Sequence, residues 1–340
     1  MGQQNSSPVL LAQTVCPVGS NVRGVFTRIS VPTPFQVGRV NAYLAGRTVV
    51  DPGPESEEAW ATLLDALDAA GLAPDDIEQV VVTHPHPDHF GLARRFRDMG
   101  ARVLASPEAA DIMAEFEDRL HYEQEYFTDF FQRCGLSAGT ASTVTDLPEA
   151  FLPFAPDVET DRRLDDGDRL TVVDTTLTAA PVVGHAVGEL VFGFDAGGQR
   201  RAIVGDNVLG NITPNPFLQP PTERGGERPR VLPAYNESLR WLAEQSYDRF
   251  LPGHGEDVTA PADRIDEILA AHEDRTDAVR ELVDGPTVPA DVMNGLFEDL
   301  PLTEQFSGLS EAVGHLDVLE ARGAVTQRTS GDVLVYEPTQ

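Results

Sequence analysis

Apolar and polar positions change period along the first two thirds of the chain, and this change predicts strands alternating with helices. Residues 38–54 resemble two short strands around a turn at Gly46, and the apolar run at 79–83 is typical of a buried strand. Between them, apolar residues at helical spacing follow Ser56, a common helix N-cap, and end at Gly71. Further patterns predict a helix through 92–99 and strands at 102–105, 170–175, 190–194 and 202–204. We therefore expect sheet layers with helices packed outside them.

Two segments interrupt this order. Residues 107–135 are helical and rich in aromatic side chains, which we expect to form core and not a ligand-binding wall. Residues 208–233 hold six prolines together with Arg224, Arg228 and Arg230, which predicts a long surface loop with solvated charges. Phosphate binding by these arginines is the alternative interpretation.

The C-terminal part predicts three helices followed by a two-stranded hairpin, the element order of a winged helix. We therefore divide the chain into a larger domain at 1–260, with a helical insert at about 107–160, and a small winged-helix-like domain at 261–340. A nucleic-acid reader exposes basic residues on its recognition helix, but 310–324 offers only Arg322 against several acidic residues. The pattern favours packing, homodimer formation or covering an active site, and no DNA partner is expected.

The charge balance is unusual, since 55 acidic residues oppose 25 basic ones, lysine is absent and the net charge is −30. Such a composition is typical of a halophilic protein, and a GC-rich acidic mesophile is the alternative. At molar salt the Debye length falls to about 3 Å, so the charge then says little about partners. Cys16 and Cys134 lack metal or redox spacing, and neither a secretory signal nor a bilayer-spanning run is visible. We expect a soluble cytoplasmic protein without a membrane partner.

The stretch THPHPDHFG, residues 83–91, holds three of the eight histidines of the chain. His84, His86, Asp88 and His89 form the pattern H-x-H-x-D-H directly after the predicted buried strand. The two prolines between them restrict the backbone, which reduces the entropy lost in holding these side chains together. The pattern predicts metal ligands, and a purely structural histidine cluster is the alternative.

More ligands are required, because each borderline-soft cation takes four or more N, O or S donors with one position left for water. Three glycine-flanked segments can supply them: VGHAVGE contains His185, IVGDN contains Asp206 and LPGHGE contains His254. Glycine beside a ligand allows close backbone approach, and loops after strands are where catalytic groups collect.

The ordered set VVDPG, THPHPDH, GH, GD and PGHG resembles the metallo-β-lactamase superfamily. In addition, VPTPFQVGRVNAYL and YNESLRWLAEQSYDRFLPGHG are similar to the glyoxalase II-like branch that carries a C-terminal winged helix. The resemblance covers most of the chain, is densest at 29–104 and 170–256, and matches the insert only in placement. It implies an αββα sandwich of the α/β class.

The resemblance also implies a ligand set. His84, His86 and His185 are expected to bind a first metal, Asp88, His89 and His254 a second, and Asp206 both. Asp51 in VVDPG is expected to orient a metal-bound imidazole from behind. The metals are two divalent ions, with zinc expected and iron or manganese as alternatives. Glu189 departs from the branch, which commonly has His or Ser after GH-x-x-G, so the inherited substrate contacts there stay open.

The activity that the resemblance implies is hydrolysis by a metal-bridging hydroxide, with Asp88 and Asp206 as the catalytic carboxylates. A small thioester or related carboxylic ester is the first choice of substrate. An endoribonuclease acting on single-stranded RNA is the alternative, because the same metal pair can stabilise both attacking and leaving oxygens. A non-catalytic metal-binding protein is the third hypothesis, and without a secretion signal a β-lactamase role is not expected.

Overall fold

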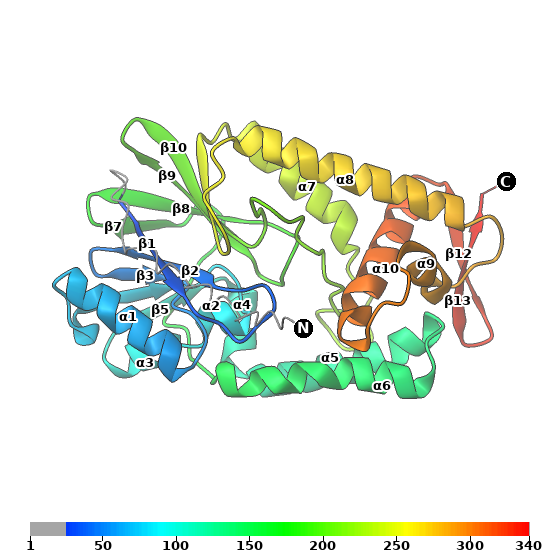
Figure 1. The fold of residues 1–340 in the computed structure, drawn as a ribbon, viewed down its shortest axis with the longest axis horizontal. Coiled ribbons are helices and arrows are strands. Elements are labelled where there is room, and N and C mark those ends of the chain that lie inside the picture. The colour runs from blue at the N-terminus through cyan, green and yellow to red at the C-terminus, as the bar shows by residue number, and fades with distance from the viewer. Residues whose placement is uncertain (1–24, 340) are drawn as a thin grey trace, which may run out of the picture.

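Two β-sheets lie face to face at one end of the molecule in the computed structural model, which describes residues 25–339 (Figure 1). The first sheet has the strand order β1-β2-β3-β4-β5-β6 and the second β11-β10-β9-β8-β7. The first comprises β1 (Thr27–Val31), β2 (Val40–Ala45), β3 (Thr48–Val50), β4 (Gln79–Val81), β5 (Arg102–Ala105) and β6 (Arg162–Arg163). The second comprises β7 (Arg169–Val172), β8 (Thr175–Pro181), β9 (Leu190–Ala196), β10 (Gln199–Gly205) and β11 (Arg249–Pro252).

Helices cover the outer face of each sheet. The first sheet carries α1 (Glu57–Ala69), η1 (Pro74–Asp76), α2 (Pro87–Phe90), α3 (Ala93–Asp98) and α4 (Pro107–Ala114), and the second carries α7 (Val231–Glu244) and α8 (Pro261–Leu282). Side chains alternate along the strands, so Val80 packs toward the helices while Val81 packs between the sheets. A third apolar cluster joins the second sheet to α7 and α8. The expected αββα sandwich is therefore confirmed.

Local sequence signals explain several of these elements. The side chain of Ser56 accepts a hydrogen bond from the backbone N–H of Ala59, as expected for the N-cap of α1. The predicted hairpin turns at Gly46, whose φ of 54° is easily adopted by glycine. The single strand expected at 170–175 is wrong. β7 and β8 are separate strands, because Val173 adopts a φ of 56° between them and is 62% exposed.

The helical insert and the C-terminal elements pack together at the other end of the molecule. They are α5 (Phe116–Arg133), α6 (Ala138–Asp146), α9 (Pro289–Leu296), η3 (Leu302–Glu304), α10 (Gln305–Ala321), β12 (Val325–Ser330) and β13 (Val333–Pro338). After α6, η2 (Leu147–Phe154) returns to the first sheet, where the Phe154 carbonyl accepts the backbone N–H of Glu55. In Figure 1, α5 and α8 both extend from the sheets to these elements. Phe127, Phe130 and Phe131 are buried in the shared apolar cluster, so the aromatic stripe is core as expected. The domain division at residue 260 stays a prediction.

Arg228 corrects the expectation of solvated arginines. The segment after β10 ends at Arg230, where α7 follows, and the Arg228 side chain is largely buried, with both Oδ atoms of Asp317 within 2.8 Å of its Nη2. Asp317 belongs to α10, which is largely buried, so this helix does not present the acidic face that its composition suggested. Arg224 and Arg230 form more exposed ion pairs with Glu125 and Glu320.

The cysteines have no metal or redox spacing in the sequence, and no apolar run is long enough to span a bilayer. Cys134 is buried with a free thiol, while Cys16 lies outside the described residues. Among residues 25–339, no helix is long and apolar enough to cross a membrane.

Candidate metal centre

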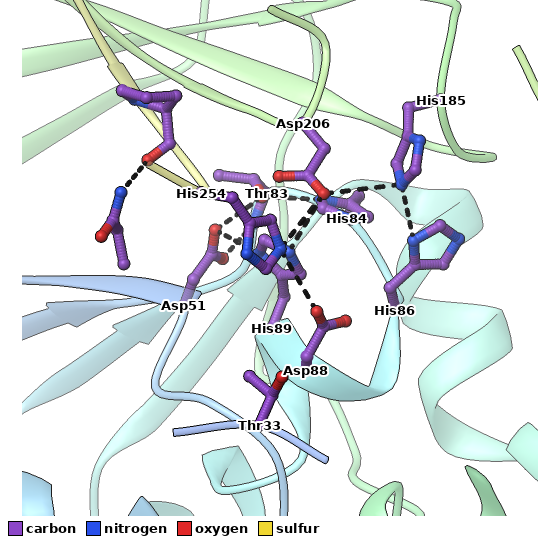
Figure 2. A network of polar contacts seen from close by, with 12 residues as sticks. Thr33, Asp51, Thr83, His84, His86, Asp88, His89, His185, Asp206 and His254 are labelled. Carbon is purple, nitrogen blue, oxygen red and sulfur yellow. Dashed lines mark hydrogen bonds and ion pairs between the residues drawn. The ribbon is translucent and has the colours of Figure 1, made fainter. Parts of the chain in front are cut away.

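The predicted ligands come together where loops from both sheets meet at one edge (Figure 2). The parallel pairs β3–β4 and β10–β11 have their carboxyl ends at this edge. Asp51 follows β3, His84 follows β4, Asp206 follows β10 and His254 follows β11. His185 comes from the connection between β8 and β9. The two sheets thus bring together ligands that are distant in the sequence.

The histidine cluster is partly helical, which the sequence did not predict. Its helix was expected to begin after the cluster, but α2 already begins at Pro87, with His86 as its N-cap residue. A proline at the first helical position is favourable because its missing N–H has no partner there in any case. Asp88 and His89 therefore lie on the first turn of a helix, which gives them fixed directions.

Asp206 lies at the centre of the cluster. Its Oδ2 atom is 3.7 Å from His89 Nε2, 3.6 Å from His185 Nε2 and 3.4 Å from His254 Nε2. His254 Nε2 is also 3.3 Å from Asp88 Oδ2. One carboxylate oxygen thus faces ring nitrogens from three separate loops, and Figure 2 shows these rings converging on it.

Asp51 holds two of the imidazole rings from behind. Its Oδ1 accepts the backbone N–H of Thr83 at 2.8 Å, and its Oδ2 accepts the Thr83 hydroxyl at 2.7 Å. The same Oδ2 is 3.0 Å from His89 Nδ1, and the Thr83 Oγ1 is 2.9 Å from His84 Nδ1. Because the hydroxyl donates its one proton to Asp51, it accepts from His84 Nδ1, which leaves His84 Nε2 without a proton.

Thr83 was missed as a functional residue, although it stands directly before His84. Asp51 itself adopts a φ of 51°, an unusual conformation for a residue other than glycine. Such conformations cost free energy and persist where the surroundings hold them. The hydrogen bonds of the Asp51 carboxylate to Thr83 and His89 provide that restraint.

The residues fit a bound metal. Nε2 of His84, His89 and His254 and Oδ1 of Asp206 are buried and lack hydrogen-bond partners, which is rare for buried polar atoms. Three groups have ligand atoms that all lie within 4.8 Å of one another: His84, His86 and His185; His84, His89 and Asp206; and Asp88, His89 and His254. The cluster can therefore hold divalent metal ions.

The electrostatics of the cluster separate two kinds of histidine. Burial and the neighbouring His185 lower the pKa of His86 to about 3, and burial also lowers the pKa of His84. Both are therefore neutral, the form that binds metal. Burial likewise lowers the pKa of His89, but the carboxylates of Asp206 and Asp88 outweigh it and raise this pKa well above its usual value. The carboxylates thus favour positive charge at the centre.

Glycines allow the ligand loops to approach one another, as the sequence indicated. A Cβ atom on Gly253 would collide with Asp206 Oδ1. One on Gly205, whose φ is 50°, would lie 2.8 Å from the Thr83 hydroxyl. Larger residues at these positions would push the loops of the second sheet away from those of the first.

Glu189 has an internal role that the sequence left open. It is fully buried, and its Oε2 accepts the Asn207 side-chain amide at 2.9 Å and the backbone N–H of His185 at 3.3 Å. Burial raises the pKa of Glu189 to about 8. The pair formed by Glu189 and Asn207 joins the loop of His185 to the loop of Asp206. Asn207 gave no sequence signal beyond its place next to Asp206.

Known proteins share this fold and chain length. A curated relative, described as "Probable metallo-hydrolase YqjP" from Bacillus subtilis (strain 168), is 30% identical over 313 residues, 91% of this chain and 96% of the relative. The crystal structure of TTHA1429, a metallo-beta-lactamase family protein from Thermus thermophilus, matches with a TM-score of 0.75 at 24% identity over 92% of this chain and 98% of its own. A beta-lactamase domain protein from Burkholderia ambifaria matches with a TM-score of 0.78 at 24% identity over 93% of each chain.

A family model provides the most direct assignment. The model described as "Metallo-beta-lactamase superfamily" matches residues 36–271, which include every predicted ligand and Asp51. Together with the sandwich and the histidine and aspartate cluster at its edge, this match shows that the chain belongs to the metallo-β-lactamase superfamily.

Proposed function

We propose that this chain is a dinuclear metal-dependent hydrolase that acts on a thioester or related carboxylic ester. The observation that carries the proposal is the position of Asp206, whose Oδ2 faces histidine nitrogens of both sets. In this assignment His84, His86 and His185 would hold one metal, Asp88, His89 and His254 would hold the other, and Asp206 would serve both. Asp51 and Thr83 orient the imidazoles of His84 and His89.

When bound, two divalent ions supply Lewis-acid polarisation of the scissile carbonyl and lower the pKa of water toward neutrality. The residues of the chain then have separate tasks. Asp88, on the first turn of α2, accepts a hydrogen bond from the attacking water and so directs its lone pair at the carbonyl carbon. A neutral imidazole that carries its one proton on the outward nitrogen keeps its inner nitrogen free to bind metal. A thiolate leaves without needing a proton, so no separate general acid is required.

The donor set suits zinc, because it combines imidazole nitrogens with carboxylate oxygens in low-coordinate groups. Iron and manganese accept the same mixed N and O donors, so they are the alternatives. Asp88 and Asp206 supply two negative charges. Binding of the metals would require the histidines of each group, His89 included, to be in the neutral form.

The arginines of the segment after β10 favour a small ester over RNA. Arg224, Arg228 and Arg230 pair with Glu125, Asp317 and Glu320, respectively, so their charges are already matched by carboxylates. RNA would be bound mainly through phosphate contacts with free cations. We keep the endoribonuclease as the second candidate, because the metal pair alone can support phosphodiester cleavage.

Several finer assignments belong to the same proposal. We place the chain in the glyoxalase II-like branch and interpret its C-terminal elements as a winged helix that supports the hydrolase. The lysine-free, acidic composition supports a halophilic protein of the cytoplasm. A homodimer is compatible with these assignments and is measured directly by light scattering.

Salt separates the two candidate substrates. Phosphate contacts weaken steeply as salt rises, because the entropy gained from counterion release is lost, whereas a small thioester makes few such contacts. We expect metal-dependent thioester turnover to persist or increase between about 0.5 and 3 M salt, where the acidic surface is screened. Single-stranded RNA should not be cleaved under the same conditions. Robust RNA cleavage at molar salt that is absent in Asp206→Ala would reverse the choice of substrate.

A further inference from the structure

The two most exposed of the predicted ligands, His86 and His185, lie side by side, with His185 Nε2 3.0 Å from His86 Nδ1. Most of the seven predicted ligands are buried, and only His86 and His185 keep partial exposure. The His185 side chain is 13% exposed, compared with 10% for that of Asp88 and 5% for those of Asp206 and His254. The side of the centre at these two rings is therefore the more open one, and the residues beside them lie where the rest of a substrate would extend.

Phe217 lies beside His185 on this open side. The centroids of the two rings are 5.4 Å apart with an interplanar angle of 59°. Phe217 is itself only partly buried, so its ring retains surface that a ligand can cover. It belongs to the segment that leaves the centre at Asp206.

Elements of the C-terminal part hold Phe217 in this position. On one side of it, the Asn215 side-chain amide donates to the backbone carbonyl of Ser307 at 3.1 Å. On the other side, the backbone N–H of Leu218 donates to the Ser310 hydroxyl at 3.3 Å. Both partners lie on α10, and Leu218 is buried in the C-terminal apolar cluster. The segment is thus attached to α10 two residues before Phe217 and one residue after it.

Phe306 continues this contact into the helical insert. Its ring centroid is 6.1 Å from that of Phe217, 5.0 Å from that of Phe127 and 5.2 Å from that of Phe131. A continuous row of aromatic rings therefore runs from α5 through α10 to the metal ligand His185. The insert and the C-terminal helices set the position of one ring at the open side of the centre.

We propose that Phe217 is a specificity-determining residue that packs against an apolar group attached to the scissile carbonyl or its leaving group, and that Phe306 positions it. This inference rests on the proposed thioesterase function. Apolar contact with a ring stabilises a bound chain in proportion to the area removed from water. Each methylene that Phe217 covers therefore raises kcat/KM by about three- to fourfold.

Two series of thioesters test the proposal with the full-length, metal-loaded protein. One series lengthens a linear acyl group from two to about eight carbons on a fixed thiol, and the other lengthens an alkyl thiol on a fixed acetyl group. The wild type should show rising kcat/KM in one series, which identifies the side that contacts Phe217. Phe217→Ala should flatten that rise, lower kcat/KM for the longest substrate by about tenfold or more, and change kcat for the shortest substrate little.

Further variants separate contact from folding. Phe217→Leu keeps an apolar side chain and should retain part of the chain-length dependence. Phe306→Leu preserves packing in the C-terminal cluster but loses the ring that supports Phe217, so it should give an intermediate slope. Trp241→Ala removes an exposed aromatic side chain from α7 and should leave the slope unchanged. Metal content and melting temperature are measured for each variant, and calorimetric binding of the product that carries the variable chain, the carboxylate or the thiol, provides a readout independent of turnover.

The outcomes are distinct. A slope that is the same in wild type and in folded, metal-loaded Phe217→Ala would overturn the inference while leaving the thioesterase intact. Absence of any thioester turnover by wild-type protein with two bound metals would overturn the proposed function, and this inference with it. Loss of metal from Phe217→Ala would assign the residue to support of His185 and would likewise contradict a role in specificity.

Discussion

The molecule contains a second group of buried histidines, and it differs from the metal centre in an instructive way. His272 on α8 and His315 on α10 lie with ring centroids 6.3 Å apart. His272 Nδ1 is 2.7 Å from Asn236 Oδ1, and His315 Nδ1 is 2.8 Å from Thr276 Oγ1. His315 Nε2 is 3.3 Å from Glu311 Oε2. Polar side chains of the surrounding helices therefore engage most of these ring nitrogens.

In the metal centre three of the histidines have hydrogen-bond partners only on their outward ring nitrogens. The outward nitrogens of His84, His89 and His254 have fixed partners, while their inner nitrogens converge on Asp206 and have none. The pair formed by His272 and His315 belongs to no group of metal-ligating side chains within residues 25–339. Burial and proximity of histidines are thus common to both places. What marks a metal site is the convergence of free nitrogens on carboxylates.

Replacing Asp206 should give the largest difference between the two histidine groups. Asp206→Ala removes the oxygen that faces both ligand sets, so metal content should fall by about one ion per chain and thioester turnover by about 1000-fold or more. Metal analysis and steady-state kinetics measure the two effects. His121→Ala, on the exposed face of α5, is the control and should match wild type. Equal losses in both variants would mean that the site is elsewhere.

Weakening the support behind the ligands should have a smaller effect. Asp51→Asn keeps the size of the side chain and tolerates the φ of 51°, but it loses the charge that holds the imidazole of His89. We expect metal affinity to fall by about 10- to 100-fold with little loss of folded protein. Competition with a chromophoric chelator measures the affinity. Glu189→Gln, which keeps an oxygen for Asn207, should have a weaker effect, and the opposite ranking would contradict the role given to Asp51.

Changing the other histidine group should affect stability and not catalysis. His272→Ala leaves Asn236 without its partner and opens a small cavity, so the free energy of unfolding should fall by about 1–3 kcal/mol. Chemical denaturation measures this loss. Metal content and turnover of the folded variant should equal those of wild type. A loss of bound metal from His272→Ala would remove the distinction between the two groups.

The pH dependence of stability sharpens the same comparison. Burial, reinforced by His315, lowers the pKa of His272 from its usual 6.5 to about 4. Between these values the unfolded chain binds a proton that the folded chain does not, so acidification favours unfolding. The contribution of His272 to stability is therefore complete above about pH 6.5 and declines as the pH falls toward 4. Metal-loaded His272→Ala should show a shallower decline than wild type in denaturation experiments across this range, and identical slopes would contradict the assignment.

Sequence patterns predicted the parts of the molecule whose signals are local. The alternation of strands and helices follows from runs of a few apolar residues, and the resemblance to a known family implied the αββα sandwich. The ligands stand in short motifs, and glycine is adjacent to three of them, His185, Asp206 and His254. The supporting contacts were not predicted, because their partners are distant in sequence. Arg228 and Asp317 are 89 positions apart, and nothing near Arg228 distinguishes a buried ion pair from a solvated charge. The break at Val173 was missed because a positive φ at valine has no sequence signature.

Metal stoichiometry, measured together with turnover, tests the central claim most directly. Protein purified without chelator should contain about two divalent ions per chain. The predicted ligands around Asp206 should bind these ions, and His272 and His315 should not. Removal of the ions should abolish thioester hydrolysis, and their return should restore it. Full turnover by protein with a metal content near zero would contradict the account.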